Sequence, residues 1–402
     1  MNNDFIPVFL GNGINAYSMA RAFHEAYGVR SVMASRALSA LDTTSVIWDC
    51  ILEPSLDEPE HFLAVMHRIA SDYGKGRKLI LIGCADHYVR LIVTYREQLE
   101  SDYIITYPGQ EAMDKMVLKE DFYALCDKYG LDYADTFVHT PETGYDYELG
   151  FGFPVVLKPS DSVKYQKHDF EGFHKVFFID NREELDETLR KIYAAGYDDH
   201  MIIQDLIPGD DANIYDLHAY VGTDHKVKLM NMGNVVLEEH GPTTVGNNAA
   251  TIVSPHPEVM EKVTALLEGI GWEGACDGDL KYDHRDGKYK MLEINIRQGR
   301  SNYRITGGGD NLARLYVDDF ILHKDIEGPK YVTEPFFWHT VPMGIVQKYV
   351  RDKEVLKQIK RLVKEGKTCS SLEYKKDRSF KRLVYLKLRD INLYRKYHMY
   401  MK

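Results

Sequence analysis

An apolar strand that runs straight into a glycine turn is the feature that most constrains how this chain can fold. Residues 5–11 (FIPVFLG) lead into residues 11–16 (GNGINA), which fit the pattern G-x-G-x-x-A, and a helical stretch, AYSMARAFHEAYG, follows. Glycines between a strand and a helix permit the tight turn of a βαβ unit. The later segments RSVMAS and KLILIG alternate with helical stretches in the same manner. We therefore predict an open α/β sheet over residues 1–114.

The same turn raises the question of a nicotinamide cofactor. A NAD site needs an acidic residue about 20 residues beyond the turn, where it binds the ribose hydroxyls. Ser35 and Arg36 occupy that region instead. Because Arg36 would suit a 2′-phosphate, an NADP-dependent oxidoreductase is one interpretation that the turn leaves open.

The composition is that of an ordinary globular protein. Of the 402 residues, 44% are hydrophobic and 28% are charged. No apolar run approaches the roughly 18 residues needed to span a bilayer, and the N-terminus lacks the basic start of a secretory signal. Five cysteines without C-x-x-C spacing suit reduced thiols better than disulfides or a zinc site. We expect a cytoplasmic protein.

The charge of the chain is unevenly distributed. From Lys348 to Lys402 there are 18 basic and 6 acidic residues, a net charge of +12, so the rest of the chain carries −23 of the total of −11. Such asymmetry indicates either an anionic partner or a solvated basic helix face. We expect no nucleic-acid partner, and a peripheral contact with an anionic membrane through the basic C-terminus is consistent with the charge.

From about residue 114 the pattern changes to α+β units with largely antiparallel strands. The helix KEDFYALCDKYG precedes a series of strands that ends with GDLKYD and KYKMLEINI. We predict a two-lobed domain over residues 115–329, with one lobe at about 115–205 and the other at about 206–329. A basic C-terminal extension, residues 330–402, begins near EGPKYVTEP.

Hard oxygen ligands lie on two consecutive strands of the second lobe. GDLKYD carries Asp279, and MLEINIRQGR carries Glu293 and Asn295, which lie two apart and so point to one face of their strand. Magnesium prefers carboxylate oxygens combined with phosphates and water. Two acids and an amide on otherwise apolar strands therefore predict a magnesium–phosphate site.

Four stretches together resemble the ATP-grasp carboxylate–amine ligases over residues 115–310. They are FPVVLKPS, MIIQDLIPGDD, GDLKYD and MLEINIRQGR. The resemblance implies a two-lobed ATP-grasp domain preceded by a Rossmann-like pre-ATP-grasp domain, which is the place of the glycine turn. It also implies ATP and Mg²⁺ as cofactors, with two metal ions bound by Asp279, Glu293 and Asn295.

The resemblance assigns nucleotide contacts residue by residue. Lys119, ahead of a helix, and Lys158, on a strand, would bind the phosphates; Lys115, one helical turn earlier, competes with Lys119 for this role. The side chain of Gln204 and the backbone of Asp205 and Ile207 would bind the adenine, and Asp211 the ribose. The loop after Lys158 holds only Gly172 where the family has several glycines, so its contacts stay open.

Catalysis and substrate binding are assigned in the same way. Arg297 would stabilise the oxyanion that forms when an amine attacks an acyl phosphate, together with Lys158 and Arg300. The residues expected to contact the substrates lie in the glycine turn and after Arg297: Gly11, Asn12, Gly13, Asn15, Arg300, Ser301, Asn302 and Tyr303.

The implied reaction is ATP-dependent amide formation between an amino-acid carboxylate and an amine through an acyl phosphate. The motifs are most similar to D-aspartate ligase-type members, which implies a cell-wall peptide precursor as the acceptor. A ligase that makes a dipeptide or another small amide, the NADP-dependent oxidoreductase and a non-catalytic nucleotide-binding module are the alternatives that the sequence leaves open.

Overall fold

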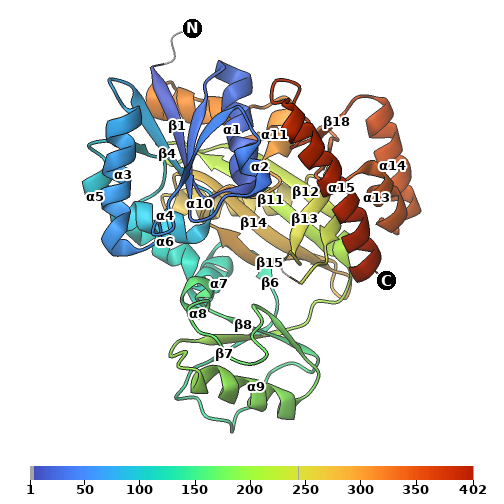
Figure 1. The fold of residues 1–402 in the computed structure, drawn as a ribbon. Coiled ribbons are helices and arrows are strands. Elements are labelled where there is room, and N and C mark those ends of the chain that lie inside the picture. The colour runs from blue at the N-terminus through green and yellow to red at the C-terminus, as the bar shows by residue number, and fades with distance from the viewer. Residues whose placement is uncertain (1–3, 243, 402) are drawn as a thin grey trace.

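A computed structural model describes residues 4–242 and 244–401 and arranges them around three β-sheets (Figure 1). The first is a five-stranded, fully parallel sheet in the order β3-β2-β1-β4-β5. Its central strand β1 is buried along its whole length, as expected for a parallel sheet covered on both faces. The elements of this part are β1 (Phe5–Leu10), α1 (Gly13–Tyr27), β2 (Ser31–Ser35), α2 (Ala40–Thr43), β3 (Trp48–Leu52), α3 (Pro59–Tyr73), β4 (Lys78–Gly83), α4 (Asp86–Thr94), α5 (Arg96–Leu99) and β5 (Tyr103–Ile105).

A small lobe with an antiparallel sheet in the order β7-β10-β8-β9 projects from the rest of the molecule (Figure 1). Its helix α9 begins where the Asn181 side chain accepts a hydrogen bond from the Glu184 amide at 3.0 Å. Leu185, Leu189 and Ile192 form the buried face of this helix. The elements from the connection through the lobe are α6 (Gln110–Val117), α7 (Lys119–Tyr129), β6 (Asp132–Tyr133), β7 (Thr136–His139), β8 (Val155–Pro159), α8 (Ser162–Tyr165), β9 (Phe177–Ile179), α9 (Arg182–Ala194) and β10 (Met201–Asp205).

The third sheet is the largest and runs in the order β18-β17-β13-β12-β11-β14-β15-β6, with β16 paired to β12. Its central strands β12, β11, β14 and β15 are antiparallel neighbours. The elements from Asp211 to Ile321 are a 3₁₀ turn (Asp211–Asn213), β11 (Ile214–Val221), β12 (Val227–Glu239), β13 (Asn247–Val253), α10 (Pro257–Gly269), β14 (Gly274–Asp283), β15 (Lys288–Asn295), α11 (Tyr303–Gly307), α12 (Leu312–Tyr316) and a π-helical turn (Val317–Ile321).

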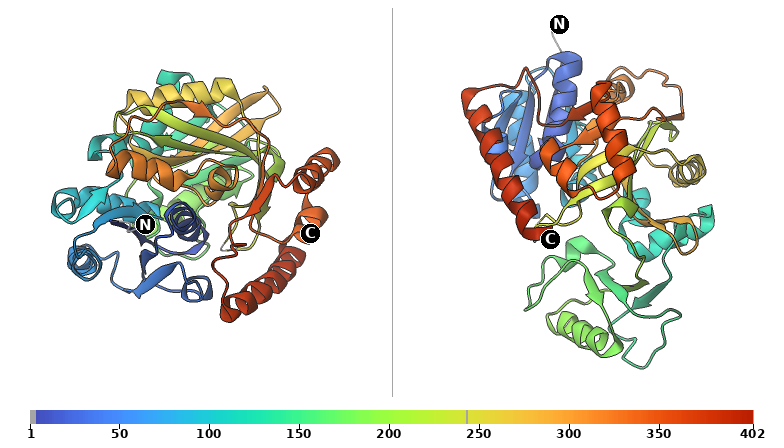
Figure 2. Two further views of the ribbon diagram at one scale, coloured as in Figure 1. Left: turned by 90° about the horizontal axis from the view of Figure 1, so that it is seen from above. Right: turned by 90° about the vertical axis from the view of Figure 1, so that its right-hand side faces the viewer.

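The basic C-terminal segment is part of this large sheet. Strand β17 pairs with β13, β18 pairs with β17, and β16 pairs with β12. Figure 2 shows the C-terminal helices along the side of the sheet. The elements are β16 (Lys330–Tyr331), β17 (Phe337–His339), α13 (Met343–Tyr349), α14 (Lys353–Lys364), β18 (Thr368–Ser370) and α15 (Phe380–Tyr400). Within the described residues, no helix is long and apolar enough to cross a membrane.

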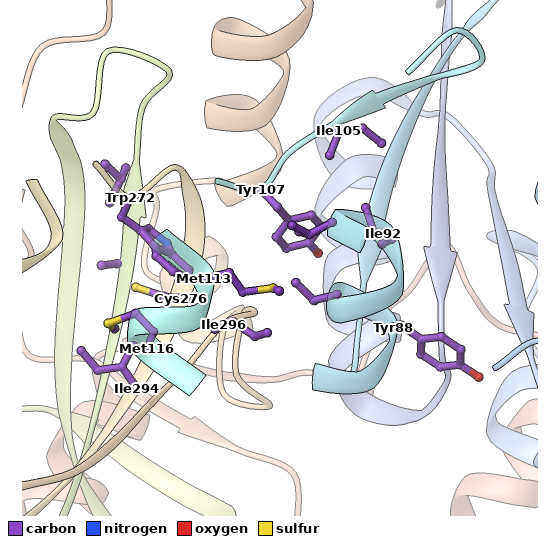
Figure 3. Close-up of a cluster of buried hydrophobic side chains, with 14 of the residues drawn as sticks. Tyr88, Ile92, Ile105, Tyr107, Met113, Met116, Trp272, Cys276, Ile294 and Ile296 are labelled. Carbon is purple, nitrogen blue, oxygen red and sulfur yellow. The ribbon is translucent and has the colours of Figure 1, made fainter. Parts of the chain in front are cut away.

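One hydrophobic core joins the first sheet to the large sheet. Ile92 and Tyr107 from the first part, Met113 of α6, and Trp272 and Ile294 from the large sheet belong to the same buried cluster (Figure 3). The small lobe has a separate cluster, built around β8, α9 and β10. The first and large sheets therefore pack as one body. The predicted fold class, a parallel α/β sheet followed by α+β units with mainly antiparallel strands, is confirmed.

Candidate active site

Two buried lysines and a glutamate meet where the small lobe faces the large sheet. Lys119 is the first residue of α7, and its Nζ lies 3.2 Å from Oε2 of Glu293 on β15. Lys158, on β8, is buried, and this burial lowers the pKa of its ammonium to about 8, although the Glu293 carboxylate opposes the shift. The three charges come from three separate elements. They form a cationic, poorly hydrated site that suits phosphate oxygens.

The candidate metal ligands lie side by side on β14 and β15. Asp279 and Glu293 are direct cross-strand partners, and the Asn295 amide donates to Asp279 Oδ2 at 3.1 Å. Burial and the Asp277 and Glu293 carboxylates raise the pKa of Asp279 well above its usual range. The Lys119 ammonium, against the effect of burial, lowers the pKa of Glu293. The arrangement leaves Asp279 as a half-buried carboxyl group that a cation would keep ionised.

These ligands suit magnesium bound together with a nucleotide. In the part of the chain that the structure describes, no group of three or more His, Cys, Asp or Glu side chains is arranged to hold a metal ion by itself. Asp279 and Glu293 supply two carboxylates, and Asn295 supplies an amide oxygen. Mg²⁺ in phosphate-transfer sites is held by one or two carboxylates plus substrate phosphates and water. The donor set therefore fits this metal.

Arg297 lies between the metal-ligand strand and the first domain. Its Nη2 donates to Asn295 Oδ1 at 3.3 Å, its Nε lies 3.5 Å from Asp86 Oδ1, and its Nη1 lies 3.7 Å from Asp277 Oδ2. Asp86 is the first residue of α4, at the carboxyl end of β4. The guanidinium is thus held beside the candidate metal ligands by carboxylates of α4 and β14, an arrangement that suits stabilisation of a developing oxyanion.

The residues predicted to bind adenine and ribose lie at the junction of the lobes. Gln204 is buried on β10, and its amide donates to Thr136 Oγ1 at 2.7 Å. The Asp205 amide donates to the Asp135 carbonyl, its carboxylate pairs with Arg285, and Ile207 is buried beyond the strand. The hydrogen bonds to Thr136 and to the Asp135 carbonyl, together with the ion pair to Arg285, therefore fix this strand edge before any ligand is considered.

Asp211 has protein partners of its own. Its carboxylate accepts hydrogen bonds from His240 Nε2 and from the Glu238 amide, both at 2.9 Å. Burial acts to raise the pKa of Asp211, but the hydrogen bond from His240 and that from the Glu238 amide lower it on balance. A ribose hydroxyl would have to share this carboxylate with His240.

The glycine turn faces the segment that follows β15. Gly11 and Gly13 have φ angles of +101° and +83°, which favour glycine, and a Cβ on Gly11 would lie 3.3 Å from the Tyr88 ring. The Asn12 amide donates to the Ala37 carbonyl at 2.8 Å, and the Asn15 amide donates to the Gln298 carbonyl at 2.9 Å. The turn therefore connects the first domain to the substrate side of the large sheet.

The residues from Arg300 to Tyr303 differ in how they are held. Arg300 pairs with Glu239 and stays partly exposed. Ser301 and Asn302 are buried, and they bond to His218 Nε2 at 2.8 Å and Asn15 Oδ1 at 3.1 Å, respectively. The Tyr303 hydroxyl donates to Glu25 at 2.9 Å. Substrate contact by Ser301, Asn302 and Tyr303 stays a prediction, because their polar atoms already serve the protein.

A buried charged network beneath the site was not predicted. Asp216 of β11 is 2.7 Å from Arg304 Nη1, both side chains are fully buried, and Arg304 Nε donates to Asn231 Oδ1 at 2.6 Å. His218 Nδ1 lies 3.0 Å from Asp277. The sequence contains a signal for this network, because polar residues alternate with apolar ones along β11.

The small lobe is tied to the first domain by an ion pair. Arg90 of α4 donates to both carboxylate oxygens of Asp161, at 2.8 and 2.9 Å. Asp161 also caps α8, where it accepts from the amides of Val163 and Lys164. Within α8, Lys164 pairs with Asp198 and Asp199. The start of the loop after Lys158 is therefore fixed by charge rather than by glycines.

Comparisons with known proteins identify the family of this chain. No protein-family model matches the chain. It is 37% identical over 397 residues to the D-aspartate ligase of Enterococcus faecium, which covers 96% of this chain and 94% of the relative. Among solved structures it is similar to an L-amino acid ligase from Bacillus licheniformis (TM-score 0.55, 15% identity, 80% and 75% of the two chains). It is also similar to N5-carboxyaminoimidazole synthetase from Staphylococcus aureus complexed with ADP (TM-score 0.60, 12% identity, 84% and 82%).

The three-sheet fold, shared with these solved structures, and the 37% identity to the Enterococcus ligase identify the chain as an ATP-grasp carboxylate–amine ligase. The enzyme is thus an ATP-dependent ligase that forms an amide bond, and the oxidoreductase and the non-catalytic module are set aside. Its similarity to the Enterococcus enzyme over almost the entire length shows that the chain belongs to the D-aspartate ligase family. Arg36, considered above for a 2′-phosphate, pairs instead with Asp57 at 2.7 Å.

Proposed function

We propose that this enzyme joins D-aspartate to an amine on the peptide of a cell-wall precursor, with ATP and two Mg²⁺ ions. The observation that carries the proposal is the full-length similarity to the D-aspartate ligase, combined with an intact set of phosphate, metal-ligand and oxyanion candidates. Asp279, Glu293 and Asn295 would hold the metal, which supplies charge neutralisation for the phosphates.

The reaction proceeds in two steps. A carboxylate oxygen of the amino acid attacks the γ-phosphorus, the bond to the β-phosphate oxygen breaks, and an acyl phosphate and ADP result. The acceptor amine then attacks the acyl carbon, phosphate leaves, and the amine loses a proton as the amide forms. Lys119 and Lys158 bind phosphate oxygens, and Arg297 and Arg300 stabilise charge on the acyl group.

Nucleotide and substrate contacts follow the same proposal. The Gln204 side chain and the backbone of Asp205 and Ile207 bind adenine, while Asp211 exchanges part of its contact with His240 for the ribose. The substrate side is formed by residues of the glycine turn and the segment after Arg297: Gly11, Asn12, Gly13, Asn15, Arg300, Ser301, Asn302 and Tyr303.

We assign the reaction to the cytoplasm. ATP is supplied there, and the five cysteines are all unpaired thiols, as expected for a reducing compartment. A fractionation experiment with a thiol-trapping step tests this assignment: the protein should stay with the soluble or inner-membrane fraction with its thiols reduced.

The decisive experiment for the reaction is ADP release with ATP and Mg²⁺ over a panel of amino acids. The panel contains both aspartate enantiomers, with and without a lysine-containing cell-wall peptide, and product masses are determined. Turnover that requires D-aspartate plus the peptide supports the proposal. Turnover with free amino acids as acceptors would instead identify the enzyme as a dipeptide- or small-amide-forming ligase.

The membrane contact is a second part of the proposal and concerns the outward face of α15. Phe380, Leu388 and Ile391 are 82%, 61% and 64% exposed, and spacings of eight and three residues bring them onto one helix face. Val384, Leu383 and Tyr394 extend this stripe, and Lys381, Lys387 and Arg395 flank it. An apolar stripe with basic flanks suits an anionic lipid surface, whereas a second copy of the helix would bring like charges together.

Vesicle sedimentation tests this contact. The enzyme should bind vesicles that contain anionic lipid more tightly than neutral ones, and Ile391→Glu should weaken the binding several-fold. Phe178→Glu is the matched control, because Phe178 is 66% exposed on the small lobe and far from α15 in sequence. Binding that does not depend on lipid charge, or a dimer in ultracentrifugation that Ile391→Glu dissociates, would contradict the membrane assignment.

A further inference from the structure

A row of polar side chains crosses three strands of the large sheet beside the candidate metal ligands. His218 on β11 is the direct cross-strand partner of Asp277 on β14, and Asp277 is the partner of Asn295 on β15. Cross-strand partners lie on the same face of a sheet, with their side chains within contact distance. Asp277 and Asn295 both contact Arg297. The row therefore leads from His218, through Asp277, to the arginine assigned to the oxyanion.

Asp277 contacts Arg297 by two routes. Its Oδ2 lies 3.7 Å from Arg297 Nη1. Its backbone carbonyl accepts a hydrogen bond from the Asn295 amide at 3.2 Å, and Asn295 Oδ1 accepts one from Arg297 Nη2 at 3.3 Å. A side chain at Gly299 would collide with the Asp277 carboxylate, so this carboxylate packs directly against the chain that follows Arg297. The position of Asp277 therefore determines where the guanidinium lies.

His218 holds the other side of the Asp277 carboxylate. Its Nδ1 lies 3.0 Å from Asp277 Oδ1, and the two side chains are 3% and 10% exposed. Within the described part of the chain, neither of these two atoms makes a hydrogen bond to any other group. Removing the imidazole would leave Oδ1 buried and without a partner, and the carboxylate would be free to turn away from Arg297.

The orientation of the His218 ring is fixed from its far side. Nε2 lies 2.8 Å from Ser301 Oγ, and the Ser301 hydroxyl donates its hydrogen to the Asp216 carboxylate. A hydroxyl has one hydrogen, so Ser301 accepts from His218 Nε2. The ring is thus anchored at Nε2, and this anchor keeps Nδ1 directed at Asp277.

We propose that His218 is a positioning residue for amide formation, which acts by holding Asp277 so that Asp277 holds Arg297 where the oxyanion develops. This inference rests on the proposed function, in which Arg297 stabilises that charge. Displacing a catalytic group by about 1 Å can cost about 10²-fold in rate. His218 should therefore affect kcat, while ATP binding, which depends on other residues, should not change.

Two substitutions of His218 separate its two contacts. The amide nitrogen of asparagine lies as many bonds from Cα as histidine Nδ1, and that of glutamine as many as Nε2. His218→Asn therefore keeps an N–H on the side of Asp277, and His218→Gln keeps one on the side of Ser301. We expect His218→Gln to lower kcat about tenfold to a hundredfold and His218→Asn to lower it less than about threefold, with KM for ATP unchanged in both.

A buried histidine elsewhere in the same sheet is the matched control. His339 on β17 is 8% exposed, and its Nδ1 contacts the Val341 carbonyl at 2.8 Å. His339→Gln should retain the kcat of the wild type even where its melting temperature falls. ADP release and product masses are measured for all variants, together with their melting temperatures.

A double-mutant cycle tests the path through Arg297. Arg297→Met removes the group that His218 is inferred to position. In that background His218→Gln should lower kcat by less than about twofold, because effects of residues that act as one unit are not additive. Equal factors in the two backgrounds would show that His218 acts elsewhere, and an unchanged kcat in Arg297→Met would remove the basis of the inference.

The remaining outcomes separate a positioning role from a structural one. A loss of kcat in His218→Asn that equals or exceeds that in His218→Gln would overturn the inference, since the contact with Asp277 would not be the one that matters. Losses of kcat that follow the melting temperature across the two His218 variants and His339→Gln would show a structural role. If the wild type uses an amino acid other than D-aspartate, only the proposed substrate fails, and the same variants measured with that amino acid still decide the inference.

Discussion

The half of the active site that faces the phosphates and the half that faces the amino acid are assembled differently. Lys119, Lys158, Glu293 and Asn295 come from the middle of the chain, and each lies within a motif that is readable by itself. The candidate substrate half combines the glycine turn near the start of the chain with the segment that begins at Arg300, after β15. The phosphate half therefore serves chemistry common to many ligases, while the substrate half can distinguish one amino acid from another.

The largest effect should come from the phosphate half. Glu293→Gln removes a candidate metal ligand and the partner of Lys119, so we expect a loss of at least about 10³-fold in kcat with every carboxylate and amine, because several kcal/mol of charge stabilisation are lost. ADP release measures this. Asp286→Asn, in the hairpin that joins the same two strands, should retain activity close to that of the wild type. A substrate-dependent loss in Glu293→Gln would contradict the division into two halves.

The next largest effect concerns the network beneath both halves. Arg304→Met leaves the fully buried Asp216 without its ion-pair partner, and we expect a loss of about 3–5 kcal/mol in the free energy of unfolding. Denaturant unfolding followed by circular dichroism measures it. Combining Arg304→Met with Asp216→Leu should recover part of the loss, since no unpaired charge remains. If the double variant is no more stable than Arg304→Met, the unpaired Asp216 carboxylate is not the cause of the loss.

A smaller effect is expected at the contact between the glycine turn and the large sheet. Asn15 donates to the Cys84 and Gln298 carbonyls and accepts from Asn302. Asn15→Ala removes these hydrogen bonds, which should cost about 1–3 kcal/mol of stability and raise KM for the amino acid more than KM for ATP. The exposed Asn392→Ala on α15 serves as the control. An equal rise in both KM values would indicate that the two halves are not separable.

The smallest effect is the pH dependence of the His240–Asp211 pair. The hydrogen bond with Asp211 raises the pKa of His240, although burial opposes it, and the Glu238 carboxylate raises it while Arg351 lowers it. The His240–Asp211 pair stabilises the fold fully below pH of about 6.5, the pKa of histidine in the unfolded state. This stabilisation is lost as the pH rises through the higher pKa of His240 in the folded protein. His240→Gln should therefore reduce stability by less than about 1 kcal/mol at pH 5.5, and the difference should shrink towards pH 8. If the stability difference between His240→Gln and the wild type stays constant from pH 5.5 to pH 8, titration of His240 does not contribute to stability.

The strands and the residues of the phosphate half were predictable because each is indicated by a pattern within one short stretch of sequence. Lys158 follows an apolar run, and Glu293 and Asn295 alternate on one strand, so the sequence pattern itself indicates their common face. Lys119 and Glu293, which the sequence assigns separately to the phosphates and to the metal, form an ion pair in the fold. The assigned roles in binding remain predictions, since the geometry alone does not test them.

The contacts of the substrate half depend on pairing between distant segments. Strand β13 joins β17, and the Tyr397 hydroxyl of α15 donates to the Glu238 carbonyl of β12. In the sequence, residues 330–402 differed from the rest only by their charge, and a net charge does not specify strand pairing. Partners that are far apart along the chain, such as Asp86 and Arg297 or Asp216 and Arg304, leave no periodic signal and became visible only in the fold.

The ion pair between Arg90 and Asp161 has a consequence for the timing of each turnover. The small lobe has its own core, and this bidentate pair joins it to the domain that carries the glycine turn. If the small lobe moves away from the body to exchange ADP for ATP, the Arg90–Asp161 ion pair must break. It forms again when the lobe returns, at the Asp161 carboxylate that also caps α8. ADP release would then become faster as ionic strength rises, because salt screens the ion pair. Salt would change the rate of nucleotide exchange and leave the rate of the chemical step unchanged.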